Sequence, residues 1–128
     1  MKKTVLYIDD DIDDQLIMEQ AIYHCDIDVK FTSIINSLDT LKHLHTTRPY
    51  DLIFLDLNMP ILDGFDILKL IKVTGKDIPV YILSTSNSKK DKETCLEMGA
   101  KGYINKPSTF GELCSALNEV LERELLPV

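Results

Sequence analysis

Short apolar runs alternate along the chain with longer stretches in which apolar residues recur every three or four positions. Residues 5–8, 52–55 and 80–83 are apolar without interruption. Continuous hydrophobicity of this length is typical of strands that are covered on both faces, as in a parallel sheet. Residues 29–35 and 102–105 are weaker strand candidates and resemble edge strands.

The stretches between these runs have helical periodicity. The pattern predicts helices over about residues 13–25, from residue 38 to before Arg48, and over about residues 65–73, 89–98 and 110–121. In the first helix, Leu16, Ile17, Ala21 and either His24 or Cys25 are predicted to share the apolar side. Gly99 is placed as the C-cap of the fourth helix, and Thr109 with Glu112 forms a capping-box pattern before the last.

Five strand–helix units in alternation predict an α/β fold, a doubly wound parallel sheet with helices on both faces. Right-handed crossovers favour the flavodoxin-like (βα)5 arrangement, with strand order 2-1-3-4-5. The length of 128 residues fits one domain over 1–128, without an output domain.

Polar residues gather where the predicted strands end. They are Asp9 and Asp10 after the first strand, Asp56 and Asn58 after the third, Ser84 and Thr85 after the fourth, and Lys106 and Pro107 after the fifth. Parallel strands end at one edge, and ligands bind there. We therefore expect three carboxylates, a hydroxyl and an ammonium to converge.

This set of groups suits phosphoryl transfer. Clustered carboxylates require a cation, and hard oxygen ligands favour Mg²⁺, with Mn²⁺ as an alternative. A carboxylate beside that ion can attack phosphorus and form an aspartyl phosphate, while Lys106 neutralises charge and Ser84 donates a hydrogen bond to a phosphate oxygen. Asp11, Asp13 and Asp14 are interpreted instead as capping residues of the first helix.

Four segments resemble the receiver domains of two-component response regulators, of the CheY-like kind. Residues 55–64 resemble the phosphoacceptor loop with its Met-Pro and Asp-Gly pairs, and Asp9-Asp10 resembles the acidic pair. Residues 79–84 are similar to the strand that ends in the switch hydroxyl, and residues 99–107 to the segment with the aromatic switch and the lysine. The similarity covers nearly the whole chain in order.

The resemblance implies a phosphorylation switch rather than an enzyme. Asp56 would take phosphate from a histidine kinase or a histidine phosphotransfer protein. Asp10, Asp56 and the backbone carbonyl of Asn58 would bind Mg²⁺ directly, and Asp9 through water.

Other residues of the chain also acquire roles from the resemblance. Ser84, Thr85 and Lys106 would stabilise the phosphate, Ser84 and Tyr103 would transmit its presence, and Pro107 is a candidate for a cis peptide bond. Ser84 replaces the commoner Thr of the family, and Thr85 stands where a small Ala is usual.

The bulk composition excludes several other classes. A net charge of −7 argues against nucleic-acid binding and against a polybasic membrane anchor. The three cysteines form neither a disulfide framework nor a zinc pattern, and no apolar run is long enough for a signal peptide or a membrane span. We expect a cytoplasmic protein, either a monomer or a phosphorylation-dependent dimer.

Two other functions remain as alternatives. A receiver fold can serve as a docking module without phosphorylation. A haloacid-dehalogenase-like phosphatase would use Asp9 and Asp11, but Asp13 stands where its motif has Thr or Val. Any signal must reach a downstream protein that the sequence does not identify. The predicted docking face is the polar helix with Lys89, Lys90 and Lys92, beside Tyr103. The same pattern is also typical of a helix that is merely solvated.

Overall fold

Five parallel strands form one sheet in the computed structural model, which describes residues 2–44, 50–57, 59 and 63–126. The strands are β1 (Lys3–Ile8), β2 (Val29–Ile34), β3 (Leu52–Asp56), β4 (Val80–Ser84) and β5 (Gly102–Asn105). Their order is β2-β1-β3-β4-β5, and every neighbouring pair is parallel. The predicted fold class and strand order are confirmed.

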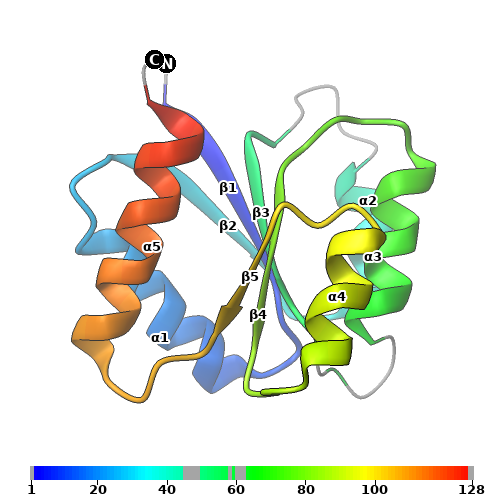
Figure 1. Ribbon diagram of the computed structural model, residues 1–128. Coiled ribbons are helices and arrows are strands. Elements are labelled where there is room, and N and C mark those ends of the chain that lie inside the picture. The colour runs from blue at the N-terminus through cyan, green and yellow to red at the C-terminus, as the bar shows by residue number, and fades with distance from the viewer. Residues whose placement is uncertain (1, 45–49, 58, 60–62, 127–128) are drawn as a thin grey trace.

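Helices cover both faces of this sheet. They are α1 (Ile12–Tyr23), the 3-10 helix η1 (Ser37–Asp39), α2 (Thr40–Leu44), α3 (Gly64–Val73), α4 (Lys89–Glu97) and α5 (Phe110–Leu125). Figure 1 shows α1 and α5 on one face and α2, α3 and α4 on the other. In the same view the strands end at the lower edge, where α1, α3, α4 and α5 begin.

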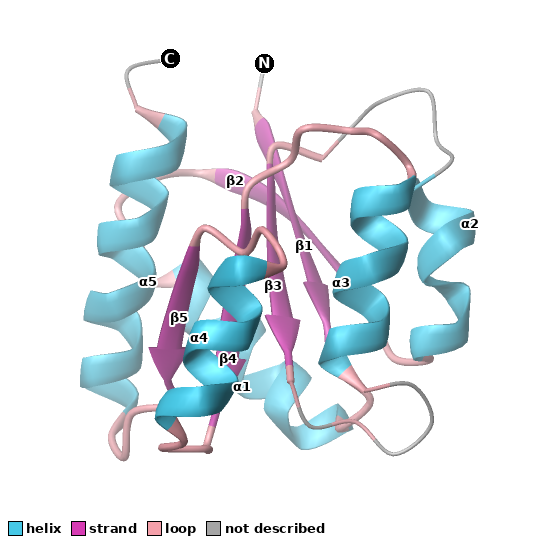
Figure 2. Ribbon diagram, turned by 45° about the vertical axis from the view of Figure 1, so that its right-hand side comes forward, coloured by secondary structure: helices cyan, strands magenta, loops and turns pink. Residues whose placement is uncertain are grey.

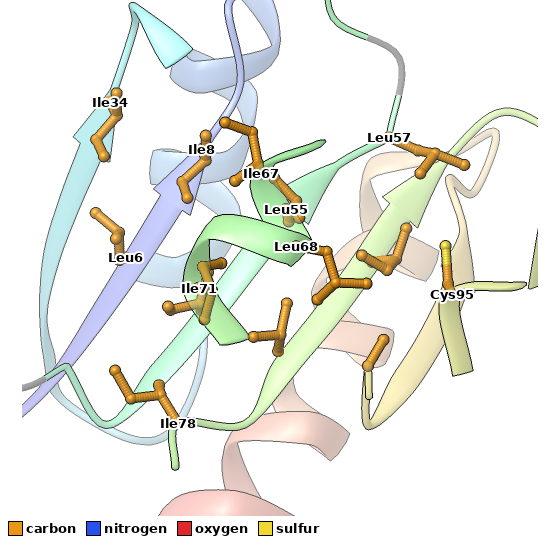
Figure 3. Close-up of a cluster of buried hydrophobic side chains, with 14 of the residues drawn as sticks. Leu6, Ile8, Ile34, Leu55, Leu57, Ile67, Leu68, Ile71, Ile78 and Cys95 are labelled. Atoms are coloured by element: carbon orange, nitrogen blue, oxygen red, sulfur yellow. The ribbon is translucent and has the colours of Figure 1, made fainter. Parts of the chain in front are cut away.

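Side chains alternate between the two faces of the sheet along each strand, and they form two separate hydrophobic cores. Leu6 and Ile8 of β1 point into the cluster beneath α3 and α4 (Figure 3), whereas Val5 and Tyr7 point into the cluster beneath α1 and α5. Since both faces are covered, every residue of β3 and β4 is buried. This double burial explains the unbroken apolar runs in the sequence.

The buried face of α1 includes the predicted Ala21 but differs from the prediction at Leu16 and Ile17. Leu16 and Ile17 are 56% and 47% exposed, and the buried positions are Gln15, Met18, Ala21 and Ile22. The amide of Gln15 donates hydrogen bonds to the backbone carbonyls of Asp9 and Ile34, both at 2.8 Å. These two bonds turn the polar Gln15 inward and leave the adjacent apolar pair at the surface.

Three predicted helix ends are confirmed. The side chain of Asp11 caps α1 by accepting from the backbone N–H groups of Asp13 and Asp14. Thr109 caps α5 by accepting from the backbone N–H of Glu112 at 3.1 Å. Gly99 has φ +103°, the left-handed conformation that follows a helix and favours glycine.

The expectations for the cysteines and for membrane-spanning segments can be compared with the described residues. Cys25, Cys95 and Cys114 are all free thiols. Within the part of the chain that the structure describes, no helix is both long and apolar enough to cross a membrane.

Gly64 allows α3 to begin close to the end of β3. This is the edge of the sheet at which the strand arrows end in Figure 2. Its backbone N–H donates to the carbonyl of Leu57 at 2.8 Å. A Cβ at this position would lie 2.6 Å from the Leu57 Cα and 2.9 Å from the Asp56 carbonyl oxygen. Because both neighbours are backbone atoms, only glycine allows this close approach.

Gly64→Ala is therefore expected to lower the free energy of unfolding by about 1–3 kcal/mol through overpacking. Gly111→Ala is the matched control, because Gly111 also lies in the first turn of a helix and a Cβ there meets no atom within 4 Å. That control is expected to be neutral or to add up to about 1 kcal/mol. Urea denaturation measures both, and equal effects of the two substitutions would contradict the steric account.

Candidate functional site

The carboxylate of Asp9 is held in a fixed orientation at the end of β1. It is 1% exposed, and its Oδ2 accepts a hydrogen bond from the hydroxyl of Tyr7 at 2.5 Å. Its Oδ1 accepts from the backbone N–H of Asp11 at 2.9 Å. Both oxygens are thus oriented by donors that belong to the first strand and the turn after it.

The environment of Asp9 favours the protonated form. Burial, helped by the neighbouring Asp56 carboxylate, raises its pKa to about 7, although the hydrogen bonds from Tyr7 and Asp11 and the charge of Lys106 act to lower it. Burial, together with the adjacent Asp9 carboxylate, also raises the pKa of the Tyr7 hydroxyl. A divalent cation at this place would favour the charged carboxylate.

Asp56 lies at the end of β3 and faces Lys106. The Asp56 side chain is 6% exposed, and its Oδ1 lies 3.4 Å from the Lys106 Nζ. Lys106 follows β5, and its backbone N–H donates to the carbonyl of Ser84 at 2.8 Å, which fixes the lysine next to the end of β4. Two of the predicted strand-end groups are therefore in direct contact.

Lys106 contacts two further carboxylates. Its Nζ lies 3.0 Å from Oδ2 of Asp14 and 3.8 Å from Oδ2 of Asp9. Burial lowers the pKa of this ammonium, but the charges of Asp56, Asp14 and Asp9 outweigh that effect, so the pKa lies above its ordinary value. Lys106 is therefore charged throughout the neutral pH range.

Asp10 does not join this group. Its Oδ1 accepts from the backbone N–H of Ser37 at 2.9 Å, and its Oδ2 accepts from the Ser37 hydroxyl at 3.2 Å. Ser37 is fully buried at the start of η1, where its N–H needs an acceptor. The side chain of Asp10 thus faces β2 and η1, and its role as a direct metal ligand stays a prediction.

The hydroxyl residues predicted for phosphate binding lie at the end of β4. Ser84 is buried, and its Oγ accepts from the backbone N–H of Ser86 at 3.0 Å. Thr85 is exposed. The Tyr103 hydroxyl reaches inward from β5 and donates to the carbonyl of Ser86 at 3.1 Å, so Ser84 and Tyr103 contact the same loop residue.

The predictions for Asn58 and for the Pro107 peptide bond are not tested by the described residues. Asn58 lies outside the described residues. Pro107 lines a cavity of about 140 Å³ together with Tyr7, Asp14 and Lys106. The cis peptide bond expected at Pro107 stays a prediction.

Sequence reasoning missed two members of this site. Asp14 was interpreted as a capping residue, although a carboxylate in the first turn of a helix that follows a strand end can also face that end. Tyr7 was treated only as a strand residue. The sequence does contain an indication of its role. A tyrosine in a buried strand requires a hydrogen-bond partner for its hydroxyl, and Asp9, two residues later, provides one.

The donor set fits a hard divalent cation. Asp9, Asp14 and Asp56 each offer a carboxylate oxygen, and these oxygens lie within 4.8 Å of one another. Carboxylate oxygens at this spacing suit Mg²⁺ or Mn²⁺. The same edge therefore combines a group of oxygens that can bind a cation with the ammonium of Lys106.

The family follows from comparison with known proteins. The profile described as response regulator receiver domain matches residues 5–118. The chain belongs to this family. The protein is also similar to the transcriptional regulatory protein PrrA of Mycobacterium leprae, with 34% identity over 119 residues, which are 93% of this chain and 50% of PrrA. CusR of Escherichia coli is 35% identical over 81 residues, 63% of this chain and 36% of CusR.

Solved structures agree with the receiver fold. The phosphorylated cyanobacterial phytochrome response regulator RcpA has a TM-score of 0.88 and 25% identity, and the match covers 100% of this chain and 97% of that one. The receiver domain of the Francisella response regulator 1452 has a TM-score of 0.77 and 30% identity, covering 95% and 98%. The receiver domain spans half or less of the length of the curated relatives described here.

The raised pKa of Asp9 predicts a pH-dependent stability in buffer without divalent cations. Between the unfolded value of 3.8 and the folded value of about 7, the folded chain holds a proton that the unfolded chain has released. The contribution of Asp9 to the free energy of unfolding therefore falls as pH rises through this range. Asp9→Asn removes the fall and is expected to raise stability at pH 8 by about 1–3 kcal/mol.

Urea denaturation from pH 4 to pH 8 with a chelator measures this difference. Asp13→Asn is the control, because Asp13 is exposed in the same segment. The account of Asp9 is wrong if the stability curves of wild type and Asp9→Asn run parallel over this range.

Proposed function

We propose that the receiver domain is a signalling switch that accepts a phosphoryl group on Asp56. The observation that carries this proposal is the contact of Asp56 with Lys106 at 3.4 Å, in a carboxylate cluster at the strand ends of a receiver domain. An Asp56 oxygen would attack phosphorus, and the bond from phosphorus to the donor would break, with its electron pair leaving on the donor. The donor would be a histidine kinase, a histidine phosphotransfer protein or a small acyl phosphate.

The site residues would divide this chemistry between them. A bound Mg²⁺ would neutralise charge on the carboxylates and the phosphoryl oxygens. Asp9 and Asp56 would hold it, with Asp10 and the Asn58 carbonyl as the further ligands that the family resemblance implies. Lys106 would pair with a phosphoryl oxygen, since its ammonium already lies beside Asp56.

Ser84 and Tyr103 would report the phosphate to the surface. The Ser84 hydroxyl would donate to a phosphoryl oxygen, with Thr85 beside it at the rim. Ser84 and Tyr103 both contact Ser86, whose hydroxyl donates to the Asp91 carboxylate of α4 at 3.0 Å. A movement of Ser84 toward phosphate would therefore pass to the start of α4 through this loop, as in two-state switches that local charge biases.

Incubation with acetyl phosphate and Mg²⁺ is expected to add the mass of one phosphoryl group to the intact protein. Asp56→Asn removes the attacking carboxylate and is expected to abolish the adduct. Asp66→Asn is the control, because Asp66 is exposed in the first turn of α3 and bonds to the cap residue Asp63 through its backbone N–H rather than its carboxylate. A wild type without adduct would favour the phosphorylation-independent docking module. An undiminished adduct on Asp56→Asn would overturn the proposal as well, because another residue would then accept the phosphoryl group.

The downstream partner is proposed to bind the surface of α4 and β5. Lys89, Lys90 and Lys92 are exposed on α4, so an acidic partner surface would complement them. Charge reversal of these three lysines to Glu is expected to reduce phosphorylation-dependent capture of the partner at least about tenfold. Pulldown with phosphorylated and unphosphorylated protein measures this, and capture that survives the reversal argues against this surface.

A further inference from the structure

The shortest ion pair of Lys106 runs to a residue outside the strand ends. Its Nζ lies 3.0 Å from Asp14, compared with 3.4 Å from Asp56 and 3.8 Å from Asp9. Of these three pairs, the one with Asp14 also has the geometry of a hydrogen bond, donated by the Lys106 Nζ to the Asp14 Oδ2. Asp14 therefore competes with Asp56 for the same ammonium.

The backbone of Asp14 is anchored on both sides. Asp11 accepts a hydrogen bond from the Asp14 N–H at 3.3 Å. The neighbouring Gln15 is buried and donates from its side chain to the carbonyls of Asp9 and Ile34. The first turn of α1 is thereby fixed to the ends of β1 and β2, which sets where the backbone of Asp14 lies.

Lys106, in contrast, has space to move. The cavity of about 140 Å³ lies between α1, β1 and α5 and is lined by Tyr7, Asp14, Lys106 and Leu113 among others. The Lys106 side chain is 21% exposed. A carboxylate on this anchored turn can therefore determine where in that space the ammonium lies.

We propose that Asp14 is a positioning residue that holds Lys106 partly away from Asp56. This inference rests on the proposed function. Without Asp14, the ammonium would move onto the Asp56 carboxylate, the nearest remaining partner. Asp56 would then offer less negative charge to a divalent cation, because an ammonium and a metal ion compete for the same oxygens.

The test measures Mn²⁺ affinity by isothermal titration calorimetry, without any phosphodonor. Asp14→Asn is expected to weaken binding roughly threefold to tenfold, because the released ammonium would then neutralise more of the Asp56 charge. Asp13→Asn makes the same charge change one residue away, on an exposed side chain. This control is expected to change the affinity less than about twofold.

A double-mutant cycle with Lys106→Met separates positioning from direct effects. Loss of the Asp14 charge acts on the metal in both backgrounds, but release of the ammonium occurs only where Lys106 is present. The penalty of Asp14→Asn is therefore expected to be at least about threefold smaller in the Lys106→Met background. Equal penalties in both backgrounds would mean that Asp14 is itself a metal ligand or acts by its field alone, and would overturn the proposal.

Two checks make the result specific. Thermal unfolding confirms that each variant is folded, and Asp14→Ala gives the same comparison if the asparagine variant does not fold. The acetyl phosphate experiment on wild type is scored independently. Phosphorylation without coupling in the cycle refutes the role of Asp14 alone, whereas absence of phosphorylation refutes the proposed function whatever the cycle shows.

Discussion

The ammonium of Lys106 makes the carboxylate cluster of this domain possible. Asp9 and Asp56 are 1% and 4% exposed, and Asp14 places a third carboxylate beside them. Like charges at this distance repel strongly where water is excluded. A cation is required to keep them together, and Lys106 supplies it at 3.0–3.8 Å from all three.

The sheet provides the rigidity that this cluster needs. Asp56 pairs in register with Leu83, and the backbone N–H of Lys106 donates to the carbonyl of Ser84, so the sheet sets the backbone positions of Asp56 and Lys106 relative to each other. Two apolar cores hold these strands, one beneath α3 and α4 and one beneath α1 and α5. The hydrogen bond from Tyr7 to Asp9 connects the second core to the site directly.

The site also has contacts with elements that can transmit a change. Asp10 is hydrogen-bonded to Ser37 at the start of η1, and Ser84 reaches α4 through Ser86 and Asp91. A new charge on Asp56 would alter the balance of forces at several helix ends at once. This arrangement suits a receiver domain, whose signal has to appear at the surface.

The spacing of apolar residues along the chain predicted poorly which side of α1 faces the core. In α1 the apolar pair Leu16 and Ile17 indicated the buried side, yet Gln15 and Met18 are buried instead. The hydrogen bonds of Gln15 to the carbonyls of Asp9 and Ile34 decide this rotation. Such bonds join residues 6 and 19 positions apart, and periodicity within one helix contains no information about them.

The sequence by itself determined the strands, their order and the residues at their ends. Unbroken apolar runs require burial on both faces, and parallel strands with crossover helices must end at one edge, so the convergence of Asp9, Asp56 and Lys106 followed from local pattern. Only the tertiary structure decided which other carboxylate joins them. The orientation of Asp14 toward Lys106 and of Asp10 toward Ser37 depends on the rotation of α1 and the place of η1, which long-range contacts set.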